Sequence, residues 1–386
     1  MAAGPGNQAP DEALRPLHGT LLSLVFGLVI LGLVFVFSAS FTTASRPLAD
    51  GTPGDSYQFL RLQAAHAIIG FVLVVGISLL NPVTIGRAGG LLFLLTFLLT
   101  ALTLTGLSFV RCSHGSCRWL QFGPLRLQPS EFAKLALILY LAANLARGPL
   151  NARNFGRVGL RIAMASLLLV VIIFMQKDQG MATLIVLITL ALCYLGHLRG
   201  WWLGLLTATT FGAGLLGLLL EEYRWKRILA FFDPVRYRST WGWQILVMKT
   251  TIARGGLGGV GLAQCPEKLH YLPEPYTDSI FCVLASEAGF IGAGVLLALI
   301  GALIFYIMEI ASESRSRVGY FMAAGIGVML SLQFLINIGV AAHLLPVTGL
   351  TLPFISYGGS SLVACMAGIG VVMAVHRHGE PKQRQR

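Results

Sequence analysis

Long apolar runs, interrupted by short segments with Gly, Pro or charged residues, recur along the whole 386-residue chain. A hydrocarbon core about 30 Å thick needs roughly 20 apolar residues per helix, so each run of about this length predicts a membrane-spanning helix. The runs cover residues 19–40, 64–81, 89–109, 131–147, 158–175, 181–198, 201–220, 279–309, 319–344 and 357–376. The pattern predicts an all-α polytopic membrane protein with ten transmembrane helices.

The composition agrees with this pattern. Hydrophobic residues make up 55% of the chain and charged residues only 11%, and the mean hydropathy is +0.76. A water-soluble domain of this size would be far more polar. We expect a disordered, Pro- and Gly-rich tail over residues 1–18, a transmembrane domain over residues 19–376 and a basic tail over residues 377–386.

The orientation follows from the Lys and Arg residues near the helix ends. With the N-terminus in the cytoplasm, the cytoplasmic segments hold more basic residues than the short outside loops, as the positive-inside rule requires. An even number of helices then returns the C-terminus to the cytoplasm, where its basic tail would meet an anionic leaflet. Both termini are therefore predicted to be cytoplasmic.

A long outside loop, residues 221–278, separates the seventh and eighth predicted helices. It carries eight of the 28 basic residues of the chain, namely Arg224, Lys226, Arg227, Arg236, Arg238, Lys249, Arg254 and Lys268. One interpretation is that long loops escape the charge rule, and the other is a site for an anionic ligand at the outer leaflet. Charge alone does not separate the two.

Two cysteines, Cys112 and Cys117, lie five residues apart in another outside loop. An oxidising compartment would join them in a disulfide. With His114 between them a metal site is the alternative, but three ligands this close together lack the spacing of a zinc site. The disulfide is the favoured interpretation.

The segment TGLTLPFISYGGSS, residues 348–361, joins the last two predicted helices. Pro353 and the glycine pair that follows prevent a regular helix, so the backbone must be buried in protein or line a polar cavity. Hydroxyl groups, among them those of Ser356 and Tyr357, crowd around this break. The segment is predicted to be a re-entrant loop that lines a polar cavity.

The segment WLQFGPLRLQPSEFAK leads from an outside loop into the fourth predicted helix. Ser130 is a natural N-cap there, Glu131 favours the positive end of the helix dipole, and Lys134 shares the face of Glu131. Capping, with Lys134 extended to the membrane interface, is one account. The other is a functional ion pair that faces the bundle interior. Trp119 fits either a site or an aromatic belt.

The turn QKDQG contains Lys177 and Asp178. A tight turn needs polar residues and a glycine, so structure alone explains most of it. Because the turn emerges on the same face as the other polar segments, a role in a site there remains equally open.

The stretch LPEPYTDSIF brings Glu274 and Asp278 to the edge of the eighth predicted helix, after the glycine-rich GGLGGVGL. The glycines allow close backbone approach and match no nucleotide-binding pattern. Asp278 would cap the helix, and on local chemistry a cap is the favoured account. Glu287 lies inside the apolar run, where an ionisable residue is a functional candidate.

Four motifs follow one another along the chain: WLQFGPLRLQPSEFAKLALILYLA, QKDQG, KLHYLPEPYTDSIFCVLASEAGFIG and LPVTGLTLPFISYGGSSL. Together they resemble the SEDS family, the shape, elongation, division and sporulation glycosyltransferases of the RodA, FtsW and SpoVE kind. The match covers nearly the whole chain. The resemblance implies a ten-helix fold in the bacterial cytoplasmic (inner) membrane.

The resemblance also implies an activity, the polymerisation of lipid II into glycan strands at the outer membrane face, with release of undecaprenyl diphosphate. Asp278 maps to the catalytic carboxylate, and Trp119, Glu131 and Lys134 map to substrate-binding positions. The other predicted substrate-binding residues are Lys177, Asp178, Arg224, Lys249, Glu274, Glu287, Ser356 and Tyr357. The implied partners are a class B penicillin-binding protein and other division or elongation membrane proteins, and neither nucleic acid nor an organic cofactor is expected.

The chemistry suits this assignment. Glycosyl transfer to a sugar hydroxyl needs a base for the hydroxyl proton, and Asp278 is the candidate. The diphosphate leaving group needs cations, supplied by the basic loop together with a divalent cation, Mg²⁺ or Mn²⁺, as a further candidate.

Two other classes of function compete with this one. A flippase or transporter of a lipid-linked precursor would also have many helices and a polar cavity, but it should place charges near the bilayer midplane. A non-catalytic scaffold for the penicillin-binding protein is the third hypothesis. Within the family, GLTLPFISYGGSS is typical of division and sporulation members and LLPVTG of the elongation member, and the division type is favoured.

Overall fold

The computed structural model describes residues 15–45, 54–113, 116–123, 125–148, 158–197, 204, 207–208 and 222–378. Within these ranges the long helices are α1 (Arg15–Ala44), α2 (Gln58–Ser78), α3 (Pro82–Leu102), α4 (Pro129–Leu145), α6 (Leu160–Met175), α7 (Gln179–Leu195), α12 (Ile280–Glu313), α13 (Arg317–Ala341) and α14 (Gly359–His378). The helix predicted over residues 201–220 falls almost entirely outside the described residues. Most of each predicted tail, residues 1–14 and 379–386, does too.

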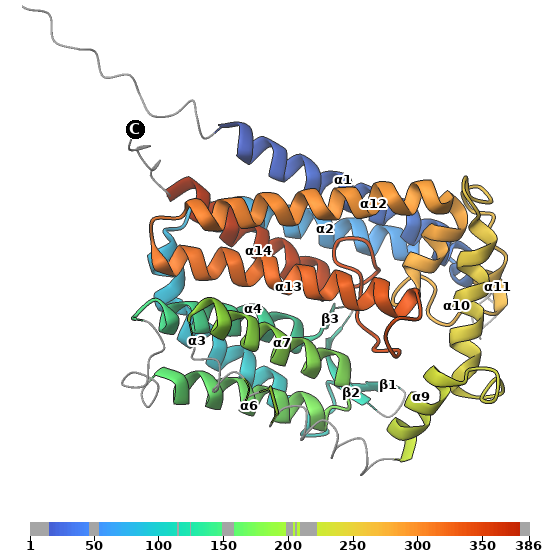
Figure 1. Ribbon diagram of the computed structural model, residues 1–386, viewed down its shortest axis with the longest axis horizontal. Helices are drawn as coiled ribbons and strands as arrows, with labels where there is room; N and C mark the ends of the chain where they lie inside the picture. Colours follow the sequence, from blue (N-terminus) through green and yellow to red (C-terminus); the bar gives the residue numbers. More distant parts are fainter. Residues whose placement is uncertain are drawn as a thin grey trace, which may run out of the picture.

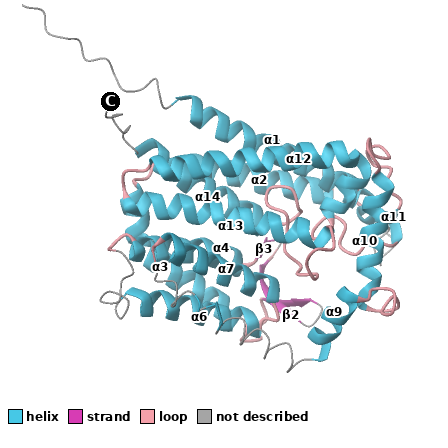
Figure 2. Cartoon of the chain, viewed as in Figure 1, coloured by secondary structure: helices cyan, strands magenta, loops and turns pink. Residues whose placement is uncertain are grey.

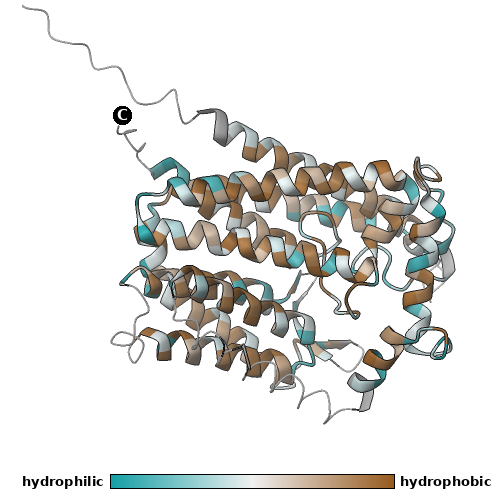
Figure 3. Ribbon diagram, in the orientation of Figure 1, coloured by the Kyte–Doolittle hydropathy of each residue, from teal (hydrophilic) through white to brown (hydrophobic). Residues whose placement is uncertain are grey.

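These helices run side by side along the long axis of the molecule (Figure 1). Among the described residues, six helices are long and apolar enough to cross a membrane, namely α1, α2, α3, α12, α13 and α14. α6 and α7 are shorter apolar helices of the same bundle. Hydrophobic residues cover most of their length, and hydrophilic residues gather toward the ends (Figure 3). The predicted polytopic membrane fold is confirmed.

Two helices begin well before their predicted starts. α2 begins at Gln58, six residues before the predicted start at residue 64, and α3 begins at Pro82. The apolar run 89–109 predicts a helix that starts seven residues later than α3 does. Asn81 is the N-cap of α3 and its side chain accepts a hydrogen bond from Val83 N (2.8 Å), while Pro82 occupies the first helical position. This Asn-Pro start signal lies before Arg87 and a glycine pair, which resemble loop residues in a hydropathy profile.

Two of the segments between the long helices contain regular structure that hydropathy did not predict. β1 (Val110–Ser113), β2 (Ser116–Phe122) and β3 (Leu125–Leu127) form a small antiparallel sheet between α3 and α4 (Figure 2). The long loop 222–278 contains α9 (Glu222–Phe232), α10 (Trp241–Gly255) and the short α11 (Glu267–His270). α9–α11 and the strands lie at the end of the bundle opposite the C-terminus (Figure 1). The predicted all-α polytopic class therefore holds, with one small sheet in the segment that joins α3 to α4.

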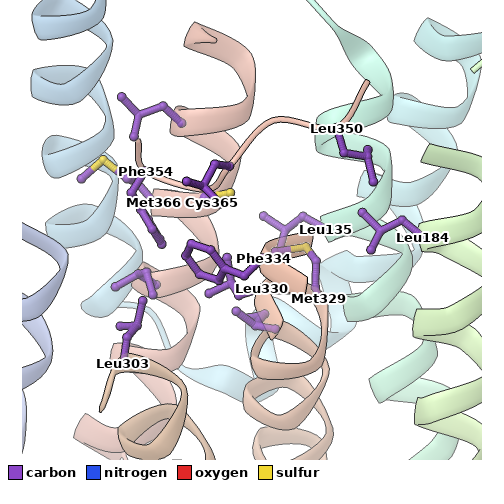
Figure 4. Close-up of a cluster of buried hydrophobic side chains, with 14 of the residues drawn as sticks. Leu135, Leu184, Leu303, Met329, Leu330, Phe334, Leu350, Phe354, Cys365 and Met366 are labelled. Carbon is purple, nitrogen blue, oxygen red and sulfur yellow. The ribbon is translucent and has the colours of Figure 1, made fainter. Parts of the chain in front are cut away.

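The segment between α13 and α14 is irregular, and its second half, residues 350–356, is mostly buried. Residues 342–358 contain no helix, and Leu352, Phe354 and Ile355 are each at most 2% exposed. Figure 4 shows Phe354 among side chains of the core that include Phe334 of α13 and Met366 of α14. Irregular backbone at this depth is stable only when protein encloses it. The predicted re-entrant loop is confirmed.

α12 is interrupted at Gly289, whose φ of 68° and ψ of −168° are not helical. The glycine-rich segment after α10 supplies the backbone hydrogen bonds that the interruption leaves open. Val260 N donates to Ser286 O (3.0 Å), and Phe290 N donates to Gly256 O (2.9 Å). The long loop is thus fixed to α12 by main-chain hydrogen bonds on both sides of the break.

Candidate functional site

Asp278 lies two residues before the first residue of α12, and its side chain is half-buried. The N-cap position of α12 belongs to Ser279, and no side-chain hydrogen bond caps the helix. Asn337 of α13 holds the Asp278 backbone through a hydrogen bond from Nδ2 to Asp278 O (3.2 Å). The prediction that Asp278 caps the helix is therefore wrong, and its carboxylate is available for another role.

The surroundings of Asp278 raise its pKa. Burial is the main cause, followed by repulsion from the Glu274 and Asp178 carboxylates, and together they raise the pKa from 3.8 to about 6. Arg118 and Arg227 act in the opposite direction and stabilise the ionised form. A carboxyl group that titrates close to neutral pH, with cations nearby, is suited to accept a proton and release it again.

Arg118 of β2 connects the sheet to the turn before α7. Its Nη1 atom lies 3.1 Å from Asp178 Oδ2, and its Nη2 donates to Lys177 O (2.8 Å). Asp178 is also the N-cap of α7, since its Oδ1 accepts from Met181 N (3.1 Å), and burial raises its pKa against the opposing charge of Arg118. The QKDQG turn therefore has a structural cap and also brings charge close to Asp278.

Glu131 and Lys134 form a buried ion pair, with Lys134 Nζ 2.5 Å from Glu131 Oε2 and the two side chains 4% and 0% exposed. Lys134 Nζ also donates to Gln333 Oε1 of α13 (2.7 Å). Gln333 Nε2 in turn donates to Thr351 O of the re-entrant loop (3.1 Å). The alternative that Lys134 extends to the membrane interface is wrong, because its ammonium group is enclosed by the bundle.

The N-cap of α4 is not the predicted residue, Ser130. The helix begins at Pro129, the N-cap position is Gln128, and Ser130 is inside the first turn with its Oγ unpaired. Gln128 N donates instead to Ser360 Oγ of α14 (2.9 Å). Proline at the first helical position needs no N–H partner, which is why the helix starts before Ser130.

The re-entrant loop holds the chain just before Asp278. Ser356 Oγ donates to Thr277 O (2.6 Å), and Tyr357 N donates to Tyr276 O (2.8 Å). The ring of Phe59 packs between the two tyrosines, at centroid distances of 4.7 Å to Tyr276 and 5.0 Å to Tyr357. Ser356 and Tyr357 therefore hold the backbone of the two residues that precede Asp278, the catalytic candidate.

The remaining predicted residues lie in different environments. Glu274 is exposed and has a positive φ of 46°, and Thr277 Oγ1 donates to its Oε2 (3.2 Å). Trp119 is half-buried in β2, paired with Arg111 across the sheet, and Lys249 is exposed on α10. The side chain of Arg224 lies outside the described residues.

The structure does not support the predicted substrate-binding role of Glu287. Its Oε1 lies 2.6 Å from Lys268 Nζ, and Ser38 Oγ of α1 donates to its Oε2 (2.7 Å). The Lys268 and Glu287 side chains are 2% and 0% exposed. This closed cluster joins α1, α11 and α12, so Glu287 stabilises the fold around the long loop.

The sequence did not single out three residues that surround the predicted site, namely Arg118, Gln333 and Asn337, and it indicated Arg227 only as one of the eight basic residues of the long loop. Arg227 of α9 has its Cζ 5.2 Å from the Trp241 ring centroid and donates from Nη1 to Val347 O (3.5 Å). Gln333 and Asn337 are one helical turn apart on α13, and both bond to the re-entrant loop. Two amides with this spacing in an apolar run are a signal that could have revealed them.

Cys112 and Cys117 form a disulfide across the pair of strands β1 and β2. It lies one residue before Arg118 and therefore fixes the strand from which Arg118 reaches Asp178. Among the described residues no three His, Cys, Asp or Glu side chains are grouped as a metal site. His114, the third member of the alternative metal site, lies outside the described residues.

The chain is similar to known proteins in both sequence and fold. Residues 19–380 match the FtsW, RodA and SpoVE family, described as "Cell cycle protein". The chain is 38% identical over 383 residues to a probable peptidoglycan glycosyltransferase FtsW of Thioalkalivibrio sulfidiphilus, covering 96% of this chain and 92% of the relative. It is 37% identical over 368 residues to stage V sporulation protein E of Bacillus subtilis, covering 93% and 96%.

Two solved structures share the fold. A chain from a study of the structural coordination of polymerization and crosslinking by a peptidoglycan synthase complex has a TM-score of 0.74, at 31% identity over 92% of this chain and 96% of that chain. The rod shape determining protein RodA of Thermus thermophilus has a TM-score of 0.68, at 29% identity over 94% and 97%.

Proposed function

This chain belongs to the FtsW, RodA and SpoVE family, and on that premise we propose that it polymerises lipid II into glycan strands with Asp278 as the catalytic base. It is a multi-pass membrane protein and a peptidoglycan glycosyltransferase of the cell wall, the activity for which its relatives are named. The observation that carries the proposal is the half-buried carboxylate of Asp278, with its pKa raised to about 6 beside Arg118 and Arg227.

The proposed reaction joins the anomeric carbon of one lipid-linked sugar to a hydroxyl of another. The Asp278 carboxylate takes the proton of the attacking hydroxyl as the new glycosidic bond forms, and the bond to the diphosphate breaks. Undecaprenyl diphosphate leaves with the bonding electron pair. Because a diphosphate is a good leaving group, one carboxylate suffices and no strong general acid is needed.

The charge that develops on the diphosphate needs positive groups nearby. Arg118 and Arg227 are close enough to lower the pKa of Asp278, so they are the proposed partners of the diphosphate oxygens. Both are also held by neighbouring backbone, Arg118 by Lys177 O and Arg227 by Val347 O. Fixed cations of this kind stabilise a transition state without further reorganisation.

A divalent cation is a further proposal. Mg²⁺ is usually bound by one or two carboxylates together with substrate phosphates, and Glu274, whose charge acts on Asp278, would supply one carboxylate while Asp278 remains the base. Bound there, the cation would neutralise charge on the diphosphate. Loss of polymerisation on chelation, restored by Mg²⁺ or Mn²⁺, would support this part of the proposal.

The membrane side and the partner follow from the same premise. α9, α10, α11 and the small sheet lie at one end of the bundle and the C-terminus lies at the other (Figure 1). We place the Asp278 end at the outer face and both termini in the cytoplasm, because the short loops at the other end are basic. A class B penicillin-binding protein that crosslinks the product is the proposed partner, and division is the favoured setting.

The test of the reaction class uses the full chain, purified with its penicillin-binding protein and supplied with labelled lipid II. Glycan polymer is the expected product from the wild type, and Asp278→Ala should form none. Movement of labelled lipid II across vesicles without polymer would instead support a transporter. Polymer from Asp278→Ala at the wild-type rate would refute the role of Asp278.

A further inference from the structure

A second polar site lies at the end of α12 opposite Asp278. A cavity of about 250 Å³ opens between the end of α7, the turn from α12 to α13 and the first turn of α13. Its lining residues are Leu195, His197, Ser314, Arg315, Arg317, Tyr320 and Phe321. One water occupies about 30 Å³ of liquid, so the cavity is large enough for a tetrahedral anion with its ester substituents.

The polar lining of this cavity is rich in hydrogen-bond donors. The polar lining residues are His197, Ser314, Arg315, Arg317 and Tyr320, and no described lining residue is acidic. The Ser314 hydroxyl already donates to Ser316 O (3.1 Å), so the arginines, the histidine and the tyrosine are the donors considered for a ligand. The acidic residues in the last turns of α12, Glu309 and Glu313, are not part of the lining. Guanidinium groups bind phosphate oxygens in a bidentate manner, so a phosphate is the anion that this donor set fits.

The depth of the cavity in the membrane points to the source of that phosphate. α13 has 25 residues, hence a length of about 37 Å, while the hydrocarbon core is about 30 Å thick. A helix of this length that is centred in the hydrocarbon extends a few ångströms beyond it at each end, so we place the first turn of α13, with Arg317, at the depth of lipid headgroups. Phe321 and Leu195 form an apolar part of the lining, which suits the glycerol and first methylenes of a lipid.

We propose that this cavity binds the phosphate group of an anionic phospholipid at the membrane face opposite Asp278. Arg315 and Arg317 contact the phosphate oxygens, and the Tyr320 hydroxyl donates a further hydrogen bond. Basic pockets at the ends of membrane helices select anionic headgroups in this way. The site is separate from the proposed catalytic centre, because α12 alone places about 50 Å of helix between them.

The test measures lipid retained by the purified full-length protein, by native mass spectrometry during titration with phosphatidylglycerol or phosphatidylcholine. The wild type should retain phosphatidylglycerol at least tenfold more tightly than phosphatidylcholine. In Arg315→Gln/Arg317→Gln the preference for phosphatidylglycerol over phosphatidylcholine should be at least tenfold smaller. The matched control, Arg147→Gln/Arg377→Gln, removes two exposed charges outside the cavity and should change it less than twofold.

Several outcomes decide the proposal. Equal losses in the two double variants would show general attraction to basic surface and overturn it. Should Arg315→Gln/Arg317→Gln fail to fold, Tyr320→Phe removes one donor from the cavity, and an unchanged preference in that variant would overturn the proposal as well. Displacement of bound phosphatidylglycerol by millimolar inorganic phosphate would show that the cavity binds free phosphate, and would overturn the lipid as its ligand. No displacement would support the lipid.

Discussion

The rate of lipid II polymerisation should fall at low pH, and the midpoint of this acid limb should depend on the charges around Asp278. The base must be ionised, so the rate at low lipid II concentration should follow the ionised fraction of Asp278 in the free enzyme. Burial and the charges of Glu274 and Asp178 raise its pKa to about 6. Glu274→Gln removes one of these repulsions and should move the midpoint of the limb to lower pH. Arg227→Gln removes an opposing cation and should move it to higher pH.

The expected magnitudes follow from the structure. With a pKa of about 6, roughly nine tenths of Asp278 is ionised at pH 7 and about one tenth at pH 5, so the wild-type rate should fall about tenfold between them. A decrease of half a pH unit in the midpoint would raise the ionised fraction at pH 5 between two- and threefold. Such a difference is measurable from initial rates.

The assay is polymerisation of labelled lipid II by the protein with its partner, from pH 4.5 to about 8 in steps of roughly half a unit, chosen to bracket that pKa. Size-exclusion chromatography at each pH checks that the protein remains folded. A polymerisation rate that does not change between pH 5 and 7 would exclude Asp278 as the group whose ionisation controls the rate. Midpoints that stay at the wild-type pH in both Glu274→Gln and Arg227→Gln would do so too, because neither charge would then act on the catalytic group.

Three further predictions concern the scaffold. Lys134→Met leaves Glu131 buried without its cation and should lower the stability by about 3 kcal/mol, whereas Lys134→Met/Glu131→Gln should recover part of it; melting temperatures in detergent distinguish the two. Gly259→Ala places a Cβ against Glu287 O at a φ of +82° and should reduce stability by at least about 1 kcal/mol, whereas Gly258→Ala has open space and should not; equal melting temperatures would contradict this. Alkylation without reductant should label neither Cys112 nor Cys117, and Cys112→Ser/Cys117→Ser should lower the stability by about 2 kcal/mol; two freely labelled thiols would disprove the disulfide.

Hydropathy was sufficient to find the long helices among the described residues, because each contains a long apolar run. It was insufficient where local signals set the structure. Asn81 and Pro82 start α3 ahead of its most apolar stretch, and the hairpin around Cys112 and Cys117 is too short and polar to register in a window of membrane length. The break of α12 at Gly289 depends on main-chain bonds from a loop about thirty residues earlier in the chain, which no local pattern contains.

Part of the candidate site was visible in the sequence and part was not. Asp278 and the pair of Glu131 and Lys134 stood out as ionisable residues at the edges of apolar runs. Arg118 did not, because an arginine in a loop between helices is ordinary, and only the folded sheet brings it to Asp178. Glu287 was misjudged for the same reason: its charge suggested a site, and only the fold brings Lys268 and Ser38 into contact with it.

In the proposed reaction the carboxylate of Asp278 removes the proton of the attacking hydroxyl. Asp278→Asn keeps the shape and removes the base, and general bases contribute about 10²- to 10⁴-fold. Since the native environment disfavours the ionised carboxylate at pH 7, the variant should fold and melt no lower than the wild type. The decisive measurement is its initial rate of lipid II polymerisation at pH 7. A loss of at least 100-fold is predicted, and a rate within tenfold of the wild type in a folded variant would contradict the account.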